Sequence, residues 1–173
     1  MEVIVTPLNY WKSEYGEDDC QDAYALDVSR GLFAVADGVS STVFARDWAR
    51  FLVQRFLDVP LLSADPFEVE WWCRSAQAAY QPPDFTSLPP GTLRERAEEG
   101  SASTLLTARA IEVTDTTATF DLLAIGDSCA IVLASSPANP SVRRTIAFPL
   151  TATEQFDLRP VSLHSRYFCL LYT

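Results

Sequence analysis

The segment Gly31-Leu-Phe-Ala-Val-Ala-Asp-Gly38 separates a strand pattern from a helix pattern. Leu32 to Ala36 is apolar on both faces, which predicts a strand in the centre of a sheet. The stretch Ala23 to Asp27 predicts a second strand, and Ser29-Arg30-Gly31 between the two predicts the turn of a hairpin. We therefore expect an antiparallel hairpin whose second strand ends at Asp37-Gly38.

A first helix is predicted after this hairpin, because apolar residues recur there with the spacing of one helix face. We expect Ser40 or Ser41 to cap its N-terminus. Aromatic residues on this helix and the next are expected to pack helices against a sheet rather than to bind a ligand; they include Trp71 and Trp72. The apolar positions of the first helix are Phe44, Trp48, Phe51, Leu52 and Phe56.

Two more helices have recognisable ends. Asp65-Pro66-Phe67-Glu68 places an N-cap acid before a proline and a capping-box glutamate, which predicts a helix that runs to about Tyr80. Gln81 to Gly91 holds four prolines and is expected to be a loop. Thr92 to Glu99 predicts a short charged helix ended by Gly100.

The second half of the chain predicts consecutive strands with short turns, among them Asp115-Thr116 and Gly126-Asp127-Ser128. Short turns join antiparallel strands, so the fold class is α+β. Two antiparallel sheets with helices outside, or one large sheet covered by helices, fit this order. The predicted strands, with one more near the N-terminus, are Val3 to Val5, Thr104 to Val113, Ala118 to Ile125, Cys129 to Ala134, Arg144 to Phe148 and Tyr167 to Tyr172.

Composition indicates one folded domain that spans residues 1–173. The net charge of −10 argues against nucleic acid and against an anionic membrane surface as partners. The chain shows no secretory signal and no apolar run of the ~18 residues that a membrane span needs. Scattered cysteines indicate reduced side chains, and we expect a cytoplasmic protein; they are Cys20, Cys73, Cys129 and Cys169.

Aspartates at strand ends are the strongest chemical signal. Antiparallel pairing would bring Asp22 and Asp37 to the same sheet edge, where two carboxylates repel unless a divalent cation neutralises them. Gly38 leaves its carbonyl open to close approach by an ion. The alternative is that each aspartate only caps a turn. The single histidine, His164, lies in no nucleophile motif and is expected to have a surface or capping role.

Four ordered motifs resemble those of the metal-dependent serine/threonine protein phosphatases, the PPM or type 2C family. They are Gln21-Asp22-Ala23-Tyr24, Gly31-Leu-Phe-Ala-Val-Ala-Asp-Gly38, Gly100-Ser-Ala-Ser-Thr104 and Leu122-Leu-Ala-Ile-Gly-Asp-Ser128. Phe148-Pro-Leu150 and the helix of Trp48 are similar to a divergent bacterial branch of that family. The resemblance covers most of the chain.

The resemblance implies an αββα sandwich with two Mn²⁺ or Mg²⁺ ions at one end of the paired sheets. Asp37 matches the carboxylate that bridges both ions, and Gly38 matches a backbone carbonyl ligand. Asp22 matches an acid of the outer site, Gln21 stands at a ligand position, and Asp127 matches a residue behind the metal ligands. The implied nucleophile is a metal-activated water rather than a side chain. The implied substrate is a phosphoserine or phosphothreonine protein, the target of a kinase in signalling.

The chain departs from the family pattern at several positions. Gln21 replaces a glutamate ligand, for which Glu17, Asp18 or Asp19 are candidate substitutes. Glu17 stands where the family has a phosphate-binding arginine, Cys129 replaces another arginine, and Val39-Ser40-Ser41 replaces a glycine pair.

The chain ends at Thr173, before the position of a second acidic motif, so we expect a domain that is incomplete at its C-terminus. The first alternative is a catalytically impaired pseudo-phosphatase that binds phosphoproteins or regulates a kinase. The second is a structural interaction domain in which the motif acids only cap turns.

Overall fold

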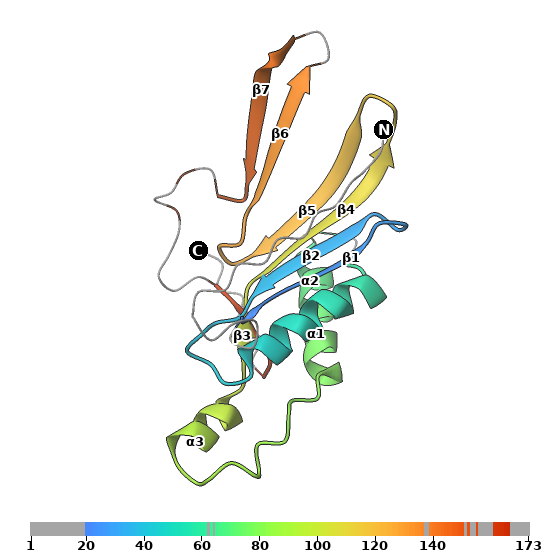
Figure 1. The fold of residues 1–173 in the computed structure, drawn as a ribbon. Helices are drawn as coiled ribbons and strands as arrows, with labels where there is room; N and C mark the ends of the chain where they lie inside the picture. The colour runs from blue at the N-terminus through green and yellow to red at the C-terminus, as the bar shows by residue number, and fades with distance from the viewer. Residues whose placement is uncertain are drawn as a thin grey trace.

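The structure is a computed structural model that describes residues 20–61, 63, 65–136, 139–150, 152, 155 and 161–166. The strands predicted at Val3 to Val5 and Tyr167 to Tyr172 lie outside these residues. The described part is a mixed α and β structure (Figure 1), which confirms the α+β class. Its elements are β1 (Asp22–Asp27), β2 (Leu32–Asp37), α1 (Ala45–Asp58), α2 (Pro66–Ala79), α3 (Thr92–Glu99), β3 (Ala102–Ser103), β4 (Leu105–Val113), β5 (Ala118–Ile125), β6 (Ala130–Ser136), β7 (Asn139–Phe148) and β8 (Leu163–His164).

The main sheet has four antiparallel strands in the order β1-β2-β4-β5. The β1–β2 hairpin and the central place of β2 confirm the prediction from the sequence. Two smaller sheets pair β3 with β8 and β6 with β7. Figure 1 shows the β6–β7 hairpin extending away from the main sheet.

The expectation of a β5–β6 hairpin is wrong, because β6 pairs with β7 instead. The connection between β5 and β6 is held near the start of β4, where the hydroxyl oxygens of Thr104 and Ser128 are 2.6 Å apart. Gly126 has a φ of 100°, in the region that favours glycine. The contact between Thr104 and Ser128, together with the turn at Gly126, directs β6 away from the edge of the main sheet.

The core lies between one face of the main sheet and helices α1 and α2 (Figure 1). Two tryptophans are almost fully buried there and both donate hydrogen bonds from Nε1. Trp48 donates to the carbonyl of Leu163 at 2.8 Å, and Trp72 donates to the carbonyl of Val59 at 2.7 Å. Burial of these large rings with satisfied indole groups favours the folded state. Apolar core residues from other elements include Leu32, Ala34, Ala36, Leu52, Phe56, Leu105 and Ile125.

Trp71 does not pack in the core, contrary to the expectation for the helix aromatics, because 64% of its surface is exposed. It precedes the buried Trp72, and successive residues on a helix point about 100° apart. Only one of the two rings can therefore face the core.

The two long helices begin differently. The Asp65 carboxylate accepts hydrogen bonds from the amides of Phe67 at 2.9 Å and Glu68 at 3.4 Å, which confirms the predicted cap of α2. The predicted Ser40 or Ser41 cap of α1 is wrong. The cap residue is Phe44, with a φ of 59° and no side-chain cap bond. The serines are the two central residues of a tight turn in which the amide and hydroxyl of Thr42 both donate to the carbonyl of Val39, each at 2.8 Å.

Three other expectations are answered in the described residues. The 81–91 segment carries no helix or strand and α3 ends before Gly100, as predicted, and the acidic side chains of α3 are exposed. Cys20, Cys73 and Cys129 are free thiols, while Cys169 lies outside the described range.

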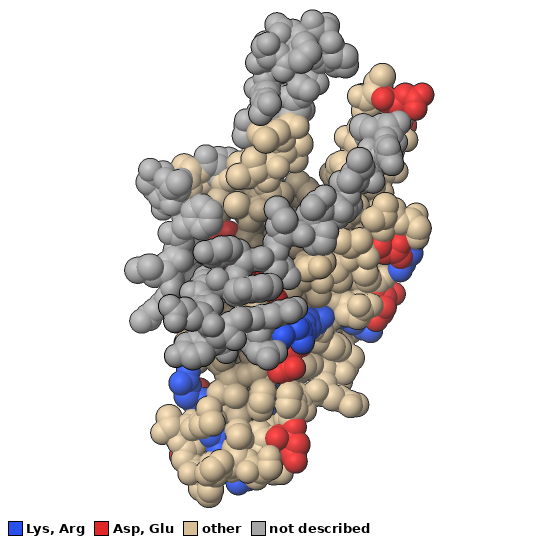
Figure 2. All heavy atoms as spheres, viewed as in Figure 1, with Lys and Arg blue, Asp and Glu red and all other residues tan. Residues whose placement is uncertain are grey.

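Acidic and basic side chains are interspersed on the face shown in Figure 2. Among the described helices, none has the length and apolar character that a membrane crossing requires.

The folded state is expected to lose stability below about pH 6.5 through His164, the only histidine of the chain. Burial lowers the pKa of His164, and its Nδ1 accepts a hydrogen bond from the amide of Arg166 at 3.2 Å, which requires the neutral ring. The unfolded state then binds more protons, so stability is complete above pH 6.5 and falls with pH below it. Urea unfolding across this range should show a smaller loss in His164→Gln. Parallel curves for both proteins would contradict this assignment.

Candidate metal site

Asp22 and Asp37 face each other across the β1–β2 hairpin as Cα partners. Residues directly opposite in an antiparallel pair project from the same face, with Cβ atoms about 4.5–5.5 Å apart. Both aspartates are exposed, whereas Ala36, the neighbour of Asp37 in the strand, is buried in the core under α1. The predicted placement of Asp22 and Asp37 opposite each other at one end of the hairpin is therefore confirmed, and both residues project from the face opposite α1.

The backbone of Asp37 is held by the segment that joins β3 to β4. Its amide donates to Thr104 Oγ1 at 3.1 Å, and its carbonyl accepts from the Thr104 amide and from Ser103 Oγ, both at 2.9 Å. Ser103 and Thr104 are both buried. Asp37 is consequently held at a defined position at the end of its strand.

Gly38 allows the chain before β1 to approach the start of α1. Its amide donates to the carbonyl of Gln21 at 3.2 Å. A Cβ at this position would lie 2.8 Å from the Gln21 carbonyl oxygen and 3.0 Å from Ala45 Cβ. Real side chains do not tolerate the first distance, so this close packing requires glycine.

Gly38→Ala is expected to destabilise the fold by about 1–3 kcal/mol, because the added methyl group forces the Gln21 backbone or α1 to move. Chemical denaturation measures this directly, and Ser40→Ala, at an exposed neighbouring position, serves as the control. An unfolding midpoint equal to that of the control would show that the packing around Gly38 relaxes without cost.

Gln21 directly precedes Asp22, and its backbone carbonyl lies opposite Gly38 across the hairpin. Its side-chain Oε1 is buried and has no hydrogen-bond partner. A buried acceptor without a partner costs about 1–3 kcal/mol. A cation would satisfy this oxygen, because amide carbonyls are ordinary ligands of hard divalent ions.

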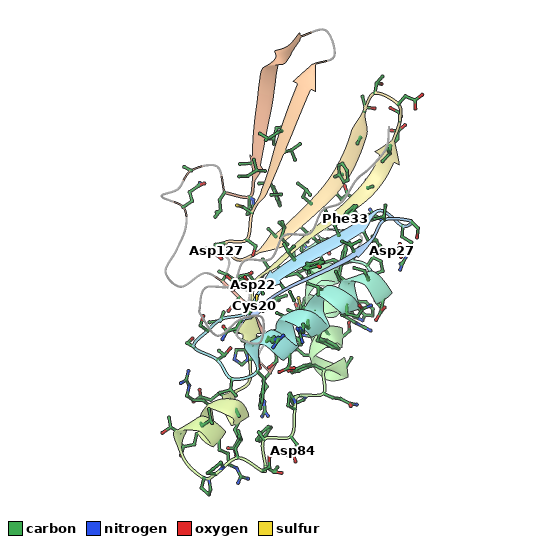
Figure 3. All side chains as sticks on the ribbon, in the orientation of Figure 1. Cys20, Asp22, Asp27, Phe33, Asp84 and Asp127 are labelled. Carbon is green, nitrogen blue, oxygen red and sulfur yellow. The ribbon has the colours of Figure 1, made fainter. Side chains whose placement is uncertain are left out.

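Asp127 lies in the turn after β5, at the same end of the main sheet as the paired aspartates. Thr104 Oγ1 contacts both the Asp37 amide and the Ser128 hydroxyl, at 3.1 and 2.6 Å, and so connects this turn to β2. Figure 3 shows the labelled Asp22 and Asp127 at this end of the sheet. The sequence motifs that carry the family resemblance are thus gathered here, although nothing in these contacts assigns Asp127 a role.

The candidate ligand atoms are of the type that binds a hard divalent cation. Asp22, Asp37 and Gln21 offer only oxygen atoms, which are the ligands of Mg²⁺ and Mn²⁺. Within the described ranges there is no group of three or more His, Cys, Asp or Glu side chains placed to hold a metal. The described part therefore supplies the Asp22–Asp37 pair. Glu17, Asp18 and Asp19, the candidate substitutes, lie outside it.

Sequence reasoning did not identify Thr104 as a residue that organises this end of the sheet. Thr104 was quoted only as the last residue of a motif, yet it contacts both β2 and the turn after β5. The unpartnered oxygen of Gln21 depends on burial, which no local pattern reveals. A small hydroxyl residue directly before a predicted strand was the only sequence signal for Thr104.

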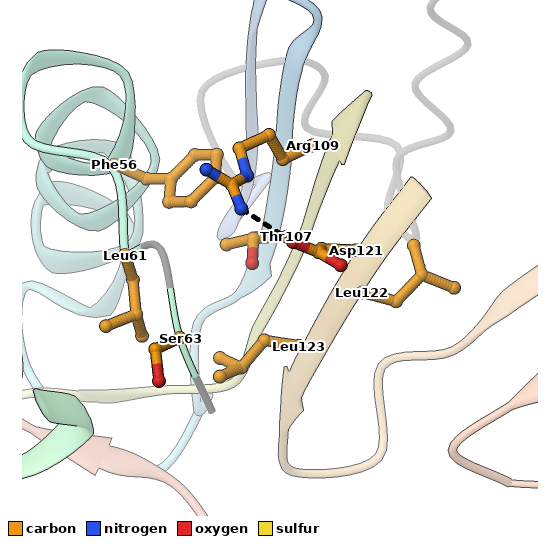
Figure 4. Close-up of a pocket in the computed structure, with 8 residues that line it drawn as sticks. All are labelled: Phe56, Leu61, Ser63, Thr107, Arg109, Asp121, Leu122 and Leu123. Atoms are coloured by element: carbon orange, nitrogen blue, oxygen red, sulfur yellow. Dashed lines mark hydrogen bonds and ion pairs between the residues drawn. The ribbon is translucent and has the colours of Figure 1, made fainter. Parts of the chain in front are cut away.

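A separate cavity of about 300 Å³ lies on the helix side of the main sheet (Figure 4). Its charged residues are Arg109 and Asp121, cross-strand partners in β4 and β5 whose side chains form an ion pair at 2.6 Å. Phe56 and Leu123 supply apolar walls. An opposite-charge pair directly across two strands stabilises a sheet, which accounts for these residues without a ligand.

The comparisons with known proteins found no matching family model, no matching curated protein and no matching solved structure.

Proposed function

We propose that this chain is a metal-dependent protein phosphatase domain that hydrolyses phosphoserine or phosphothreonine. The observation that carries the proposal is the pairing of Asp22 with Asp37 across β1 and β2, beside the closely packed Gly38. The buried, unpartnered Oε1 of Gln21 supports a cation at this place. The order of the motifs along the chain supports a phosphatase over other metal-dependent functions.

The proposal includes the αββα sandwich architecture. Helices cover one face of the main sheet, while the opposite face keeps large apolar side chains exposed by 41–43% of their surface: Tyr24, Val35 and Phe120. A second sheet packed on this face would bury these side chains, which favours a two-sheet architecture. Asp22 and Asp37 lie on this same face, at the end where the two sheets would meet.

The chain's own residues would bind and orient the reacting groups. The carboxylates of Asp22 and Asp37 and the Gln21 amide oxygen would hold Mn²⁺ or Mg²⁺, and the contacts from Ser103 and Thr104 would keep Asp37 in place. The bound ions supply Lewis acidity that activates water and neutralises the phosphoryl oxygens. Carboxylates close to a dianionic substrate would repel it without such cations, so substrate binding should depend on metal. The partner is a phosphorylated protein.

A pseudo-phosphatase is the second candidate function. It is favoured by one observation: within the described residues, no group of three or more His, Cys, Asp or Glu side chains is placed to hold a metal. A site of this kind would retain a cation weakly and bind a phosphoprotein without turnover. Such a protein would compete with active phosphatases or regulate a kinase.

Hydrolysis of a phosphothreonine peptide by the purified chain tests the proposal. We expect phosphate release with added Mn²⁺ and its loss when EDTA is present. Release that EDTA does not affect would contradict a metal-dependent mechanism. Mn²⁺-dependent peptide binding without phosphate release would support the pseudo-phosphatase instead.

A further inference from the structure

We propose that a second cavity, lined by the C-terminal ends of α2 and α3 and by residues that flank β3 and β8, binds a small oxyanion such as phosphate or a carboxylate. The cavity has a volume of about 220 Å³ and is lined by residues that include Tyr80, Ser101, Ser165 and Arg166. Pockets for drug-sized ligands have volumes of about 300–1,000 Å³, so this one suits a compact group. None of its described lining residues belongs to the candidate metal site.

The Tyr80 hydroxyl is buried and has no partner in hydrogen-bonding geometry. Burial raises the pKa of Tyr80, and the Ser101 hydroxyl lies close enough to offset part of that rise. The nearby Ser101 hydroxyl donates its own proton to the carbonyl of Val43 at 2.6 Å. The tyrosine ring cannot easily turn away, because it packs against Trp48 and Phe51 with centroid distances of 4.8 and 5.2 Å. A buried hydroxyl held in this way gains a hydrogen bond if an acceptor enters the cavity.

The Tyr80 hydroxyl keeps its proton at neutral pH. Burial, followed by the nearby Asp47 carboxylate, raises the pKa of Tyr80 to about 12. The phenol is therefore a hydrogen-bond donor toward an anion over the physiological range.

Ser165 supplies a second donor. Its Oγ accepts the amide proton of Ser101 at 2.8 Å, which leaves its own hydroxyl proton for another acceptor. Gly100 makes this arrangement possible, because a Cβ there would lie 2.8 Å from Ser165 Oγ. The Gln77 side chain fixes the same wall by donating to the carbonyl of His164 at 2.7 Å.

Arg166 gives the cavity its positive charge. The guanidinium carbon lies 5.7 Å from the centroid of the Phe85 ring, a cation–π contact from the loop between α2 and α3. No carboxylate occurs among the described residues that line the cavity. One cation with two hydroxyl donors, and no lining acid, favours an anion over a cation or an apolar ligand. Asp47 lies near Tyr80 and Glu99 lies near His164, but neither carboxylate is among the residues that line the cavity.

A titration with inorganic phosphate, followed by NMR in EDTA buffer, tests the proposal. At constant ionic strength, phosphate is expected to shift the amide signals of Gly100, Ser101 and Ser165 in a saturable way. Tyr80→Phe and Arg166→Gln should each weaken binding about tenfold, since each removes one hydrogen bond to a charged group. The matched controls Tyr24→Phe and Arg50→Gln change exposed residues outside the cavity and should bind phosphate like the unmodified chain.

Each outcome of these titrations either supports or overturns the oxyanion site. A parallel titration with acetate distinguishes a carboxylate ligand from a phosphate ligand, and saturable shifts with either one support the oxyanion site. Shifts that do not saturate with either anion, or equal affinities in the cavity variants and the controls, would overturn it. If Tyr80→Phe fails to fold, Arg166→Gln decides the matter, because Arg166 is exposed. EDTA removes metal ions, so failure here would not bear on the proposed phosphatase function.

Discussion

Asp37→Asn is expected to reduce Mn²⁺-dependent hydrolysis of a phosphothreonine peptide by at least about a hundredfold. The change keeps the shape of the side chain and removes its charge, which in the proposed site holds the cations. Removal of one ligand charge weakens the binding of the metal ions. It therefore also weakens their stabilisation of the phosphoryl oxygens. Initial rates at saturating peptide, measured over a range of Mn²⁺ concentrations, give the effect on turnover and on metal affinity separately.

The matched control is Asp58→Asn, at the exposed C-terminal end of α1, where the side-chain oxygen accepts a hydrogen bond from Gln54 at 3.1 Å. An asparagine retains that acceptor, so turnover in this variant should equal that of the unmodified chain. Turnover in Asp37→Asn within a few-fold of the control would remove Asp37 from the metal mechanism. Unfolding curves for both variants show whether a loss of activity reflects a loss of structure.

Trp48→Ala is expected to destabilise the folded state by about 3–5 kcal/mol. Only 1% of this side chain is exposed, and it packs between the main sheet and the aromatic rings of Phe51 and Tyr80. The alanine leaves a cavity, and it also removes the hydrogen bond from Nε1 to the carbonyl of Leu163. Urea unfolding followed by circular dichroism measures the free-energy change.

Two variants accompany this measurement. Trp48→Phe keeps most of the apolar burial and loses the indole donor, so its loss should be smaller than that of the alanine variant. Trp71→Ala removes a ring of the same size from an exposed position and should change stability by less than about 1 kcal/mol. Equal losses in Trp48→Ala and Trp71→Ala would contradict the placement of the core between α1 and the sheet.

Local signals explain the elements that the sequence predicted well. Ser29-Arg30-Gly31 lies between two apolar runs of strand length, and the register of β1 and β2 follows from that turn. Asp65 and Pro66 specify the start of α2 through two cap hydrogen bonds and one fixed backbone angle. These features act over a few residues, so they can be read without knowledge of the rest of the chain.

The errors arise where distant contacts decide the structure. The β5–β6 turn has the composition of a hairpin, but its Ser128 contacts Thr104, which is 24 residues away. Helix α1 begins after Phe44 rather than at Ser40 or Ser41, because two hydrogen bonds join the segment before it to the start of β3. Ser101 donates to the carbonyl of Val43, and the Thr42 hydroxyl accepts from the Ala102 amide at 3.1 Å. No window of local sequence contains both partners of these bonds.

The candidate site was predictable in part for the same reason. Asp22 and Asp37 could be placed together because a hairpin relates them by simple pairing. The contact of Asp37 with Thr104 spans 67 residues and could not be anticipated from spacing. The second cavity likewise brings together the hydroxyl groups of Tyr80, Ser101 and Ser165, which share no sequence motif.

Binding of Mn²⁺ at the Asp22–Asp37 pair is the central claim, and paramagnetic broadening of amide NMR signals tests it most directly. Substoichiometric Mn²⁺ is expected to broaden the signals of Asp22, Asp37 and Gly38 before all others, and to lose this selectivity in Asp37→Asn. Broadening centred instead on the exposed acidic residues of α3, or unchanged in Asp37→Asn, would contradict a metal site at this sheet edge.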